Sequence, residues 1–151
     1  MQAAEQTDST EVSAMRAVRL NFSKTGRAIY ISHLDINRMM TRAVRRAKLP
    51  MWYTEGFNPH PYLTFALPLS LGQSSDCEYM DIRIEGDITD EEIMNRLNAV
   101  LPEGVKILSV SAPVYDAKEI EKALYFVKLV FKDAETSKIF AERAQTLAEG
   151  E

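Results

Sequence analysis

Apolar and polar side chains alternate in two parts of the chain, at residues 18–23 and 78–85. A period of two places every second side chain on the same face of a strand, so each segment is predicted to be a strand with one buried face. The inward positions are Val18, Leu20, Phe22, Met80, Ile82 and Ile84. Residues 62–67 and 105–112 are shorter β-rich runs, and a further extended run is expected at 28–31 after a short turn.

The apolar period changes to three and four residues after Ser32, which predicts a helix over 33–48. Ser32 is the expected N-cap, and Asp35 three residues later resembles a capping box in which Asp replaces Glu. Pro50 ends the helix because the residue before a proline is pushed out of the helical region. The predicted core face consists of Ile36, Met39, Met40, Ala43 and Ala47.

A second helix is predicted at 89–101, with Thr89 as its N-cap and Pro102 as its stop. The order from residue 18 to 112 is therefore strand, helix, strand, strand, helix, strand. This order is typical of the ferredoxin-like βαββαβ arrangement. We predict an α+β fold, with an antiparallel sheet and two helices on one face.

The chain is predicted to have three parts. Residues 1–15 are polar, lack a basic-then-apolar signal pattern, and are expected to be a flexible leader. Residues 16–115 are the ferredoxin-like domain. Residues 116–151 contain an expected strand at 124–131 and an expected helix from about 136 to 148, which would open a second, incomplete unit.

Composition narrows the class of protein. Hydrophobic residues make up 46% of the chain, yet no apolar run approaches the roughly 18 residues of a membrane helix, so we expect a cytoplasmic protein without a membrane partner. The single cysteine, Cys77, excludes an internal disulfide and a multi-thiolate metal site. No close ligand spacing and no glycine-rich phosphate loop is present, so neither a metal nor another cofactor is expected.

Charge is unevenly distributed along the sequence. Residues 16–60 carry nine Lys or Arg against two acids, whereas residues 76–151 carry 17 acids against nine bases. Four arginines, Arg38, Arg42, Arg45 and Arg46, are predicted to lie opposite the apolar face of the first helix. Arginine favours bidentate contact with phosphate or carboxylate. The alternative is a solvated face on which Asp35 pairs with one or two of the arginines.

The segment Gly56-Phe57-Asn58-Pro59-His60-Pro61 predicts a stiff loop, because two prolines fix the backbone. It holds His60, and His33 starts the first helix. These two histidines are candidate catalytic residues, since they could form an acid–base pair if they face each other. The alternative is that both are structural, hydrogen-bonded to backbone.

Aromatic residues lie close in sequence to the arginines. Trp52 and Phe57 could stack bases while arginines bind phosphates, which is how single-stranded RNA is bound; they could equally be core residues. The predicted nucleic-acid-binding residues are Lys24, Arg27, Arg38, Arg42, Arg45, Arg46, Trp52, Phe57 and Asn58.

Several sequence blocks occur in a characteristic order: Phe22-Ser23-Lys24, Ile31 to Asp35, Arg42 to Ala47 with Leu49-Pro50, Glu55 to Pro61, Phe65 to Leu69, and Glu78-Tyr79. In these blocks the chain resembles the bacterial radical-SAM-linked domain of unknown function, over about residues 18–114. The resemblance implies a radical-SAM enzyme as partner or ancestral fusion. The chain cannot itself be such an enzyme, because an iron–sulfur cluster needs several thiolates.

Three functions remain open from the sequence. The first is a non-enzymatic RNA-binding or substrate-presenting accessory module of a radical-SAM or RNA-maturation system. The second is a metal-independent enzyme that acts on RNA through His33 and His60. The third is a protein–protein adaptor that docks on an acidic surface.

Overall fold

The computed structural model describes residues 15–148. The predicted flexible leader at 1–15 therefore lies, apart from Met15, outside the described residues. The regular elements are β1 (Arg16–Lys24), a 3₁₀ helix η1 (Gly26–Tyr30), α1 (His33–Arg46), β2 (Leu63–Phe65), β3 (Ser75–Ile84), α2 (Asp90–Asn98), β4 (Val105–Ser111), η2 (Ala117–Glu119) and α3 (Ala134–Ala148).

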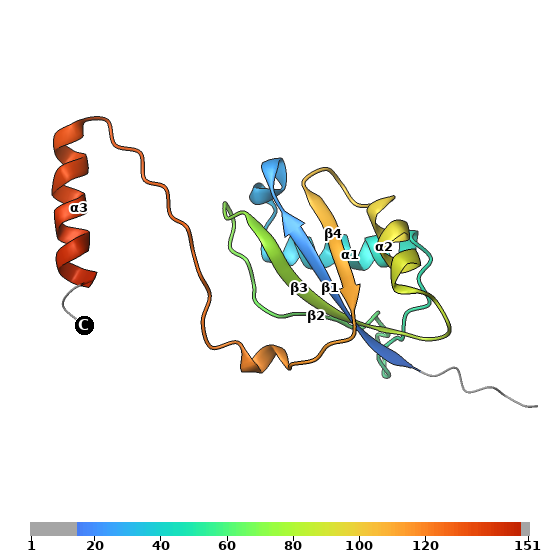
Figure 1. The fold of residues 1–151 in the computed structure, drawn as a ribbon. Helices are drawn as coiled ribbons and strands as arrows, with labels where there is room; N and C mark the ends of the chain where they lie inside the picture. The colour runs from blue at the N-terminus through green and yellow to red at the C-terminus, as the bar shows by residue number, and fades with distance from the viewer. Residues whose placement is uncertain (1–14, 149–151) are drawn as a thin grey trace, which may run out of the picture. The chain divides into compact units, whose positions relative to one another are not determined.

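The four strands form one sheet in the order β2-β3-β1-β4, and every neighbouring pair is antiparallel. Both α1 and α2 lie on the same face of this sheet (Figure 1). The predicted ferredoxin-like α+β architecture is confirmed. Contacts divide the chain into two units, one up to Ile120 and the other from Glu121 onward, so the sheet and its two helices make up the first unit.

The core lies between the sheet and the two helices. The alternating positions predicted to face inward on β1 and β3 are all buried. From α1 the buried side chains are Ile36, Met40, Ala43 and Val44, and from α2 they are Ile93 and Leu97. The hydrophobic effect on these positions therefore fixes which side of α1 faces water.

Local signals set the start and the end of α1. The Ser32 hydroxyl oxygen accepts a hydrogen bond from the Asp35 backbone N–H and donates one to the Asp35 carboxylate at 2.7 Å. This N-cap was predicted, although the Asp35 carboxylate binds the hydroxyl rather than the backbone N–H of a capping box. At the other end Lys48 adopts a φ of 51°, and the helix stops before Pro50.

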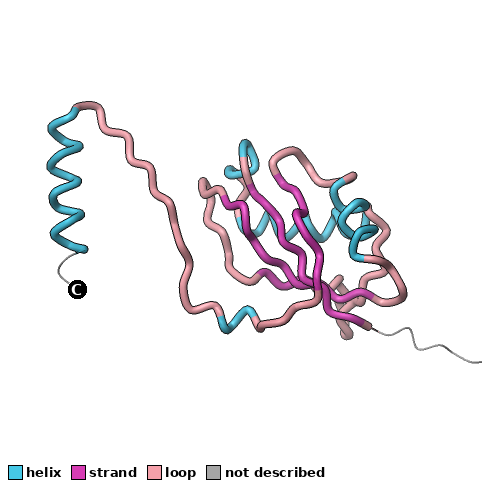
Figure 2. Tube along the Cα trace, in the orientation of Figure 1, coloured by secondary structure: helices cyan, strands magenta, loops and turns pink. Residues whose placement is uncertain are grey.

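Two predicted extended segments are wrong. Residues 28–31 fall largely in η1, because Gly26 takes a positive φ and the Ala28 N–H bonds back to the Thr25 carbonyl. Residues 124–131 have no regular secondary structure, as the loop in Figure 2 shows. A strand needs a partner for its backbone N–H and C=O groups, and no described strand pairs with this segment.

The other elements match their predictions with shifted ends. The helix expected at 136–148 begins two residues earlier as α3, where the Asp133 carboxylate accepts the Thr136 N–H at 2.7 Å. The strand expected at 62–67 shortens to β2, and at its start the Tyr62 N–H donates to the Trp52 carbonyl at 3.1 Å instead of to β3. No helix within residues 15–148 combines the length and the apolar character needed to span a bilayer.

Gly104 closes the turn before β4, and we predict that the Gly104→Ala variant is strongly destabilised. Gly104 has a φ of 87°, and an added Cβ would lie 2.5 Å from the Thr25 carbonyl oxygen. Gly72 has a similar φ of 84° with nothing within 4 Å, so Gly72→Ala is the matched control. The control should lose about 1 kcal/mol of unfolding free energy from backbone strain. Gly104→Ala should lose about 2 kcal/mol more from the clash. Equal losses in urea unfolding would contradict this packing.

Candidate functional site

The four arginines predicted on the outer face of α1 are all exposed. Three of them border a groove of about 440 Å³ between α1 and the turn that follows α2. The groove is lined by Asp35, Arg38, Met39, Arg42, Ala43, Arg46, Val100 and Pro102. Its lining therefore combines apolar side chains, three arginines and one carboxylate.

Asp35 neutralises little of this charge. Its carboxylate lies 3.4 Å from the Arg38 guanidinium, while its other oxygen accepts the Ser32 hydroxyl. Arg42, Arg45 and Arg46 have no carboxylate partner within ion-pair distance in the described part of the chain. Positive charge therefore remains uncompensated along this groove.

Arginines elsewhere in the same unit are mostly engaged. Arg16 binds Asp90 at 2.8 Å, and Arg96 pairs with a glutamate on its own helix. Arg19 and Asp81 form a bidentate pair at 2.7 and 2.8 Å, and this hydrogen bonding raises the pKa of Arg19. The difference sets the α1 arginines apart as available for an external anion. Arg27, also predicted to bind nucleic acid, is exposed in η1.

Trp52 lies away from the arginine groove. The Arg83 guanidinium carbon is 4.3 Å from the Tyr62 ring centre and 5.2 Å from the Trp52 ring centre. Arg83 alternates with the core residues Ile82 and Ile84, so this cluster is on the sheet face opposite the helices. The structure thus does not bring Trp52 together with the arginines of α1.

The predicted loop at 56–61 is closed by its own hydrogen bonds. The Thr54 N–H donates to the His60 carbonyl at 2.9 Å, and the His60 N–H donates to the Thr54 hydroxyl oxygen. His60 Nδ1 lies 3.1 Å from the Asn58 carbonyl oxygen, which can only accept, so this contact needs the proton on Nδ1. The Phe57 side chain is fully exposed and does not pack against the core of the described structure.

His33 and His60 make separate contacts. The His33 ring lies edge-on to Phe65 at 5.2 Å between ring centres, whereas the His60 ring bonds within its own loop. No hydrogen bond or ring contact joins the two histidines in the described structure. A catalytic pair therefore stays a prediction.

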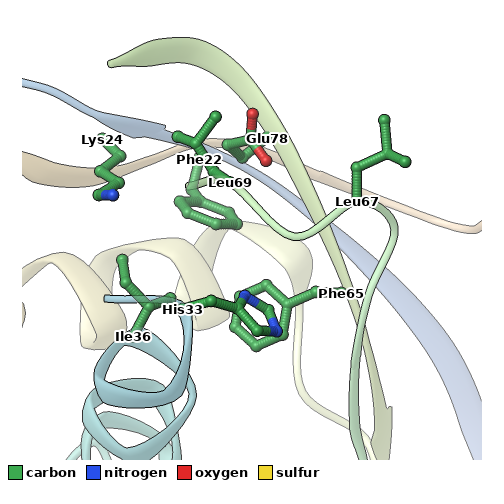
Figure 3. A pocket seen from close by; sticks show the side chains of 8 residues that line it. All are labelled: Phe22, Lys24, His33, Ile36, Phe65, Leu67, Leu69 and Glu78. Carbon is green, nitrogen blue, oxygen red and sulfur yellow. The ribbon is translucent and has the colours of Figure 1, made fainter. Parts of the chain in front are cut away.

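His33 instead borders a second hollow, a cavity of about 10 Å³ at the N-terminal end of α1 (Figure 3). Its lining consists of Phe22, Lys24, His33, Ile36, Phe65, Leu67, Leu69 and Glu78. Most of the sequence blocks that carry the family resemblance contribute a side chain here. They meet in space although they are far apart in the chain.

Lys24 is buried at this cavity, with 1% of its surface exposed. Its ammonium group has one long hydrogen bond, 3.4 Å to the Ser70 carbonyl. Burial lowers the pKa of Lys24, and the charge of Glu78 opposes this shift. Lys24 therefore does not lie on the exposed surface where a nucleic-acid contact was expected.

The sequence contained a signal for this cavity. Lys24 follows Val18, Leu20 and Phe22 at the same spacing of two residues, and Glu78 precedes Met80 and Ile82 at that spacing. Both side chains are therefore expected on the inward face of the sheet, where they line the cavity. Their charges favour exposure, whereas the alternation favours the inward side; Lys24 is buried and Glu78 is half-buried. Across residues 15–148, no group of three or more His, Cys, Asp and Glu side chains is arranged to hold a metal ion.

Replacing Lys24 by Met should stabilise the protein at neutral pH. Below the folded pKa of Lys24 the native state carries the full desolvation penalty of a buried ammonium. As pH rises from that lowered value toward 10.5, the native state loses the proton first, so wild-type stability rises. Lys24→Met should therefore gain about 1 kcal/mol at pH 7, and the gain should shrink as pH approaches 10.5.

The measurement is urea unfolding across this pH range, with Lys106→Met as control because Lys106 is exposed on β4. The control should show no comparable pH-dependent gain. A Lys24→Met variant that is less stable at every pH would contradict the cost assigned to the buried charge.

Comparison with known proteins identifies the family of the chain. No curated protein matches the sequence. A family model described as "Uncharacterized protein conserved in bacteria (DUF2344)" matches residues 17–151, which covers both units. The chain therefore belongs to this uncharacterized bacterial family.

Proposed function

We propose that this protein is a non-enzymatic RNA-binding module, and that the α1 groove binds the phosphates of a single strand. The observation that carries the proposal is the row Arg38, Arg42 and Arg46 in one groove with a single, already engaged carboxylate. Guanidinium groups bind phosphate oxygens in bidentate geometry. Successive phosphates of one strand can therefore occupy successive arginines.

Helical geometry supports this arrangement. Arg38, Arg42 and Arg46 are spaced by four residues, so they repeat about every 6 Å along α1. Consecutive phosphates of an extended single strand are separated by a similar distance. Arg45 lies beside this row on the same exposed side and can contact the strand from its edge.

The groove favours a flexible strand over a rigid duplex. A groove between a helix and a turn admits a narrow backbone, and its apolar lining residues Met39, Ala43 and Val100 can contact sugars or bases. Tyr53 and Phe57, on the loop after α1, are exposed but do not line the groove, so they would stack only on bases of a strand that extends beyond it. Stacking on such rings tolerates any base, so we expect little sequence preference.

The wider role follows from the family resemblance. We propose that the module presents RNA, or an RNA-bound substrate, to a radical-SAM enzyme or another RNA-maturation enzyme. The chemistry would then belong to the partner enzyme. The module would contribute affinity and position.

The test is binding of a single-stranded RNA to the full chain at several salt concentrations. Arg42→Glu with Arg46→Glu removes two phosphate contacts, so the logarithmic salt slope should flatten by about 1.4, or about 0.7 per contact. The affinity of the variant should fall for every RNA sequence tested. The control is Lys106→Glu with Lys118→Glu, which makes the same charge change at two exposed lysines outside the groove.

Two results would overturn the proposal. One is a wild-type chain without RNA affinity at low salt. The other is equal weakening by the groove and control variants, which would indicate attraction by overall charge. In either case an acidic protein becomes the better partner for the α1 arginines.

A further inference from the structure

The cavity beside His33 combines three ionisable side chains with an apolar lining. Lys24 and Glu78 enter it from neighbouring strands, β1 and β3, and His33 enters from the first turn of α1. Phe22, Ile36 and Phe65 supply much of the remaining wall (Figure 3). A lysine, a histidine and a glutamate thus border one small cavity at the end of the core.

Lys24 differs from every other lysine of the chain. The other seven lysines are exposed. Lys24 is buried, has no carboxylate within ion-pair distance in the described structure, and keeps only the long bond to Ser70. Its lowered pKa means that a larger fraction of this amine is neutral and nucleophilic at pH 7.

We propose that Lys24 is a reactive amine that forms an imine with a small 2-oxo acid bound in this cavity. The carbonyl carbon would meet Lys24 Nζ. The acid's carboxylate would lie toward the start of α1, where the helix dipole favours negative charge. Neither the His33 nor the Leu34 backbone N–H has a hydrogen-bond acceptor among the described residues.

The reaction is a balanced condensation. The neutral Lys24 amine attacks the carbonyl carbon, a C–N bond forms, and the carbonyl oxygen becomes a hydroxyl group after proton transfer from nitrogen. The hydroxyl then leaves with a proton as water, and a C=N bond remains. Glu78 lines the cavity and is the proposed carrier of this proton.

Entry of the ligand requires movement of residues 66–74. The present cavity holds about one water molecule. This segment covers Lys24 through the long Ser70 contact and is fixed to η1 by the Gly72 N–H, which donates to the Ile29 carbonyl at 2.8 Å. Leu67 and Leu71 on the same segment are exposed. The Ala66 N–H also donates to the Tyr79 carbonyl at 2.9 Å, so opening must break this bond together with those at Ser70 and Gly72.

The experiment treats the full folded chain at pH 7 with glyoxylate, the smallest 2-oxo acid, and cyanoborohydride, which reduces an imine to a stable carboxymethyl amine. Peptide mass mapping then follows modification at all eight lysines. We expect Lys24 to react faster than any exposed lysine, because its lowered pKa raises the fraction of neutral amine at pH 7. The exposed lysines are the internal control.

A Glu78→Gln variant tests the role proposed for the Glu78 carboxylate. Glu78→Gln keeps the size of the side chain but removes the proposed proton carrier and the charge that opposes the lowered pKa of Lys24. The lost charge alone would make Lys24 react faster, so slower modification in this variant supports the carrier role of Glu78, and faster modification contradicts it. The proposal is overturned if Lys24 is modified only in urea while exposed lysines react in the folded chain. It is also overturned if Lys24 reacts no faster than they do. RNA binding does not enter either readout, so this test is independent of the proposed function.

Discussion

The packing of α1 on the sheet is the constraint on which the rest of this structure depends. Ile36, Met40 and Val44 are buried, and burial of each such side chain contributes about 1.5–3 kcal/mol. No exposed ion pair contributes as much, since those are worth about 1 kcal/mol or less. The apolar contacts therefore decide the rotation of the helix, and the arginines on its far side must remain in water close to one another.

Two chemically different places result from this one contact. Along its exposed side, α1 contributes guanidinium groups to a groove that opens to solvent. At its first turn, the same helix covers the end of the core, where Lys24 and His33 border a small cavity. The groove suits a large polyanion, and the cavity suits a small reactive molecule. The two proposals concern separate surfaces and can succeed or fail separately.

Much of the fold could be predicted from local patterns, because period-two and period-three-to-four spacing report directly on burial. The same reasoning correctly placed the α1 arginines on the solvent-exposed face of the helix. It could not tell that Trp52 would join Arg83 on the opposite sheet face, since this depends on how the segment 51–53 pairs beside β3. The strand predicted at 124–131 has strong β propensity, but propensity cannot supply the partner strand that this segment lacks in the described structure.

The most direct test of the RNA-binding groove is an NMR titration that follows the arginine side-chain Nε–Hε signals while single-stranded RNA is added to the isotope-labelled full chain. Arg19, which pairs with Asp81, and Arg83, which contacts the Tyr62 and Trp52 rings, report on the opposite face of the sheet. We expect the signals of Arg38, Arg42 and Arg46 to shift and saturate together while those of Arg19 and Arg83 stay in place. Shifts confined to Arg19 and Arg83, or no saturable shift at any arginine, would contradict an RNA-binding groove on α1.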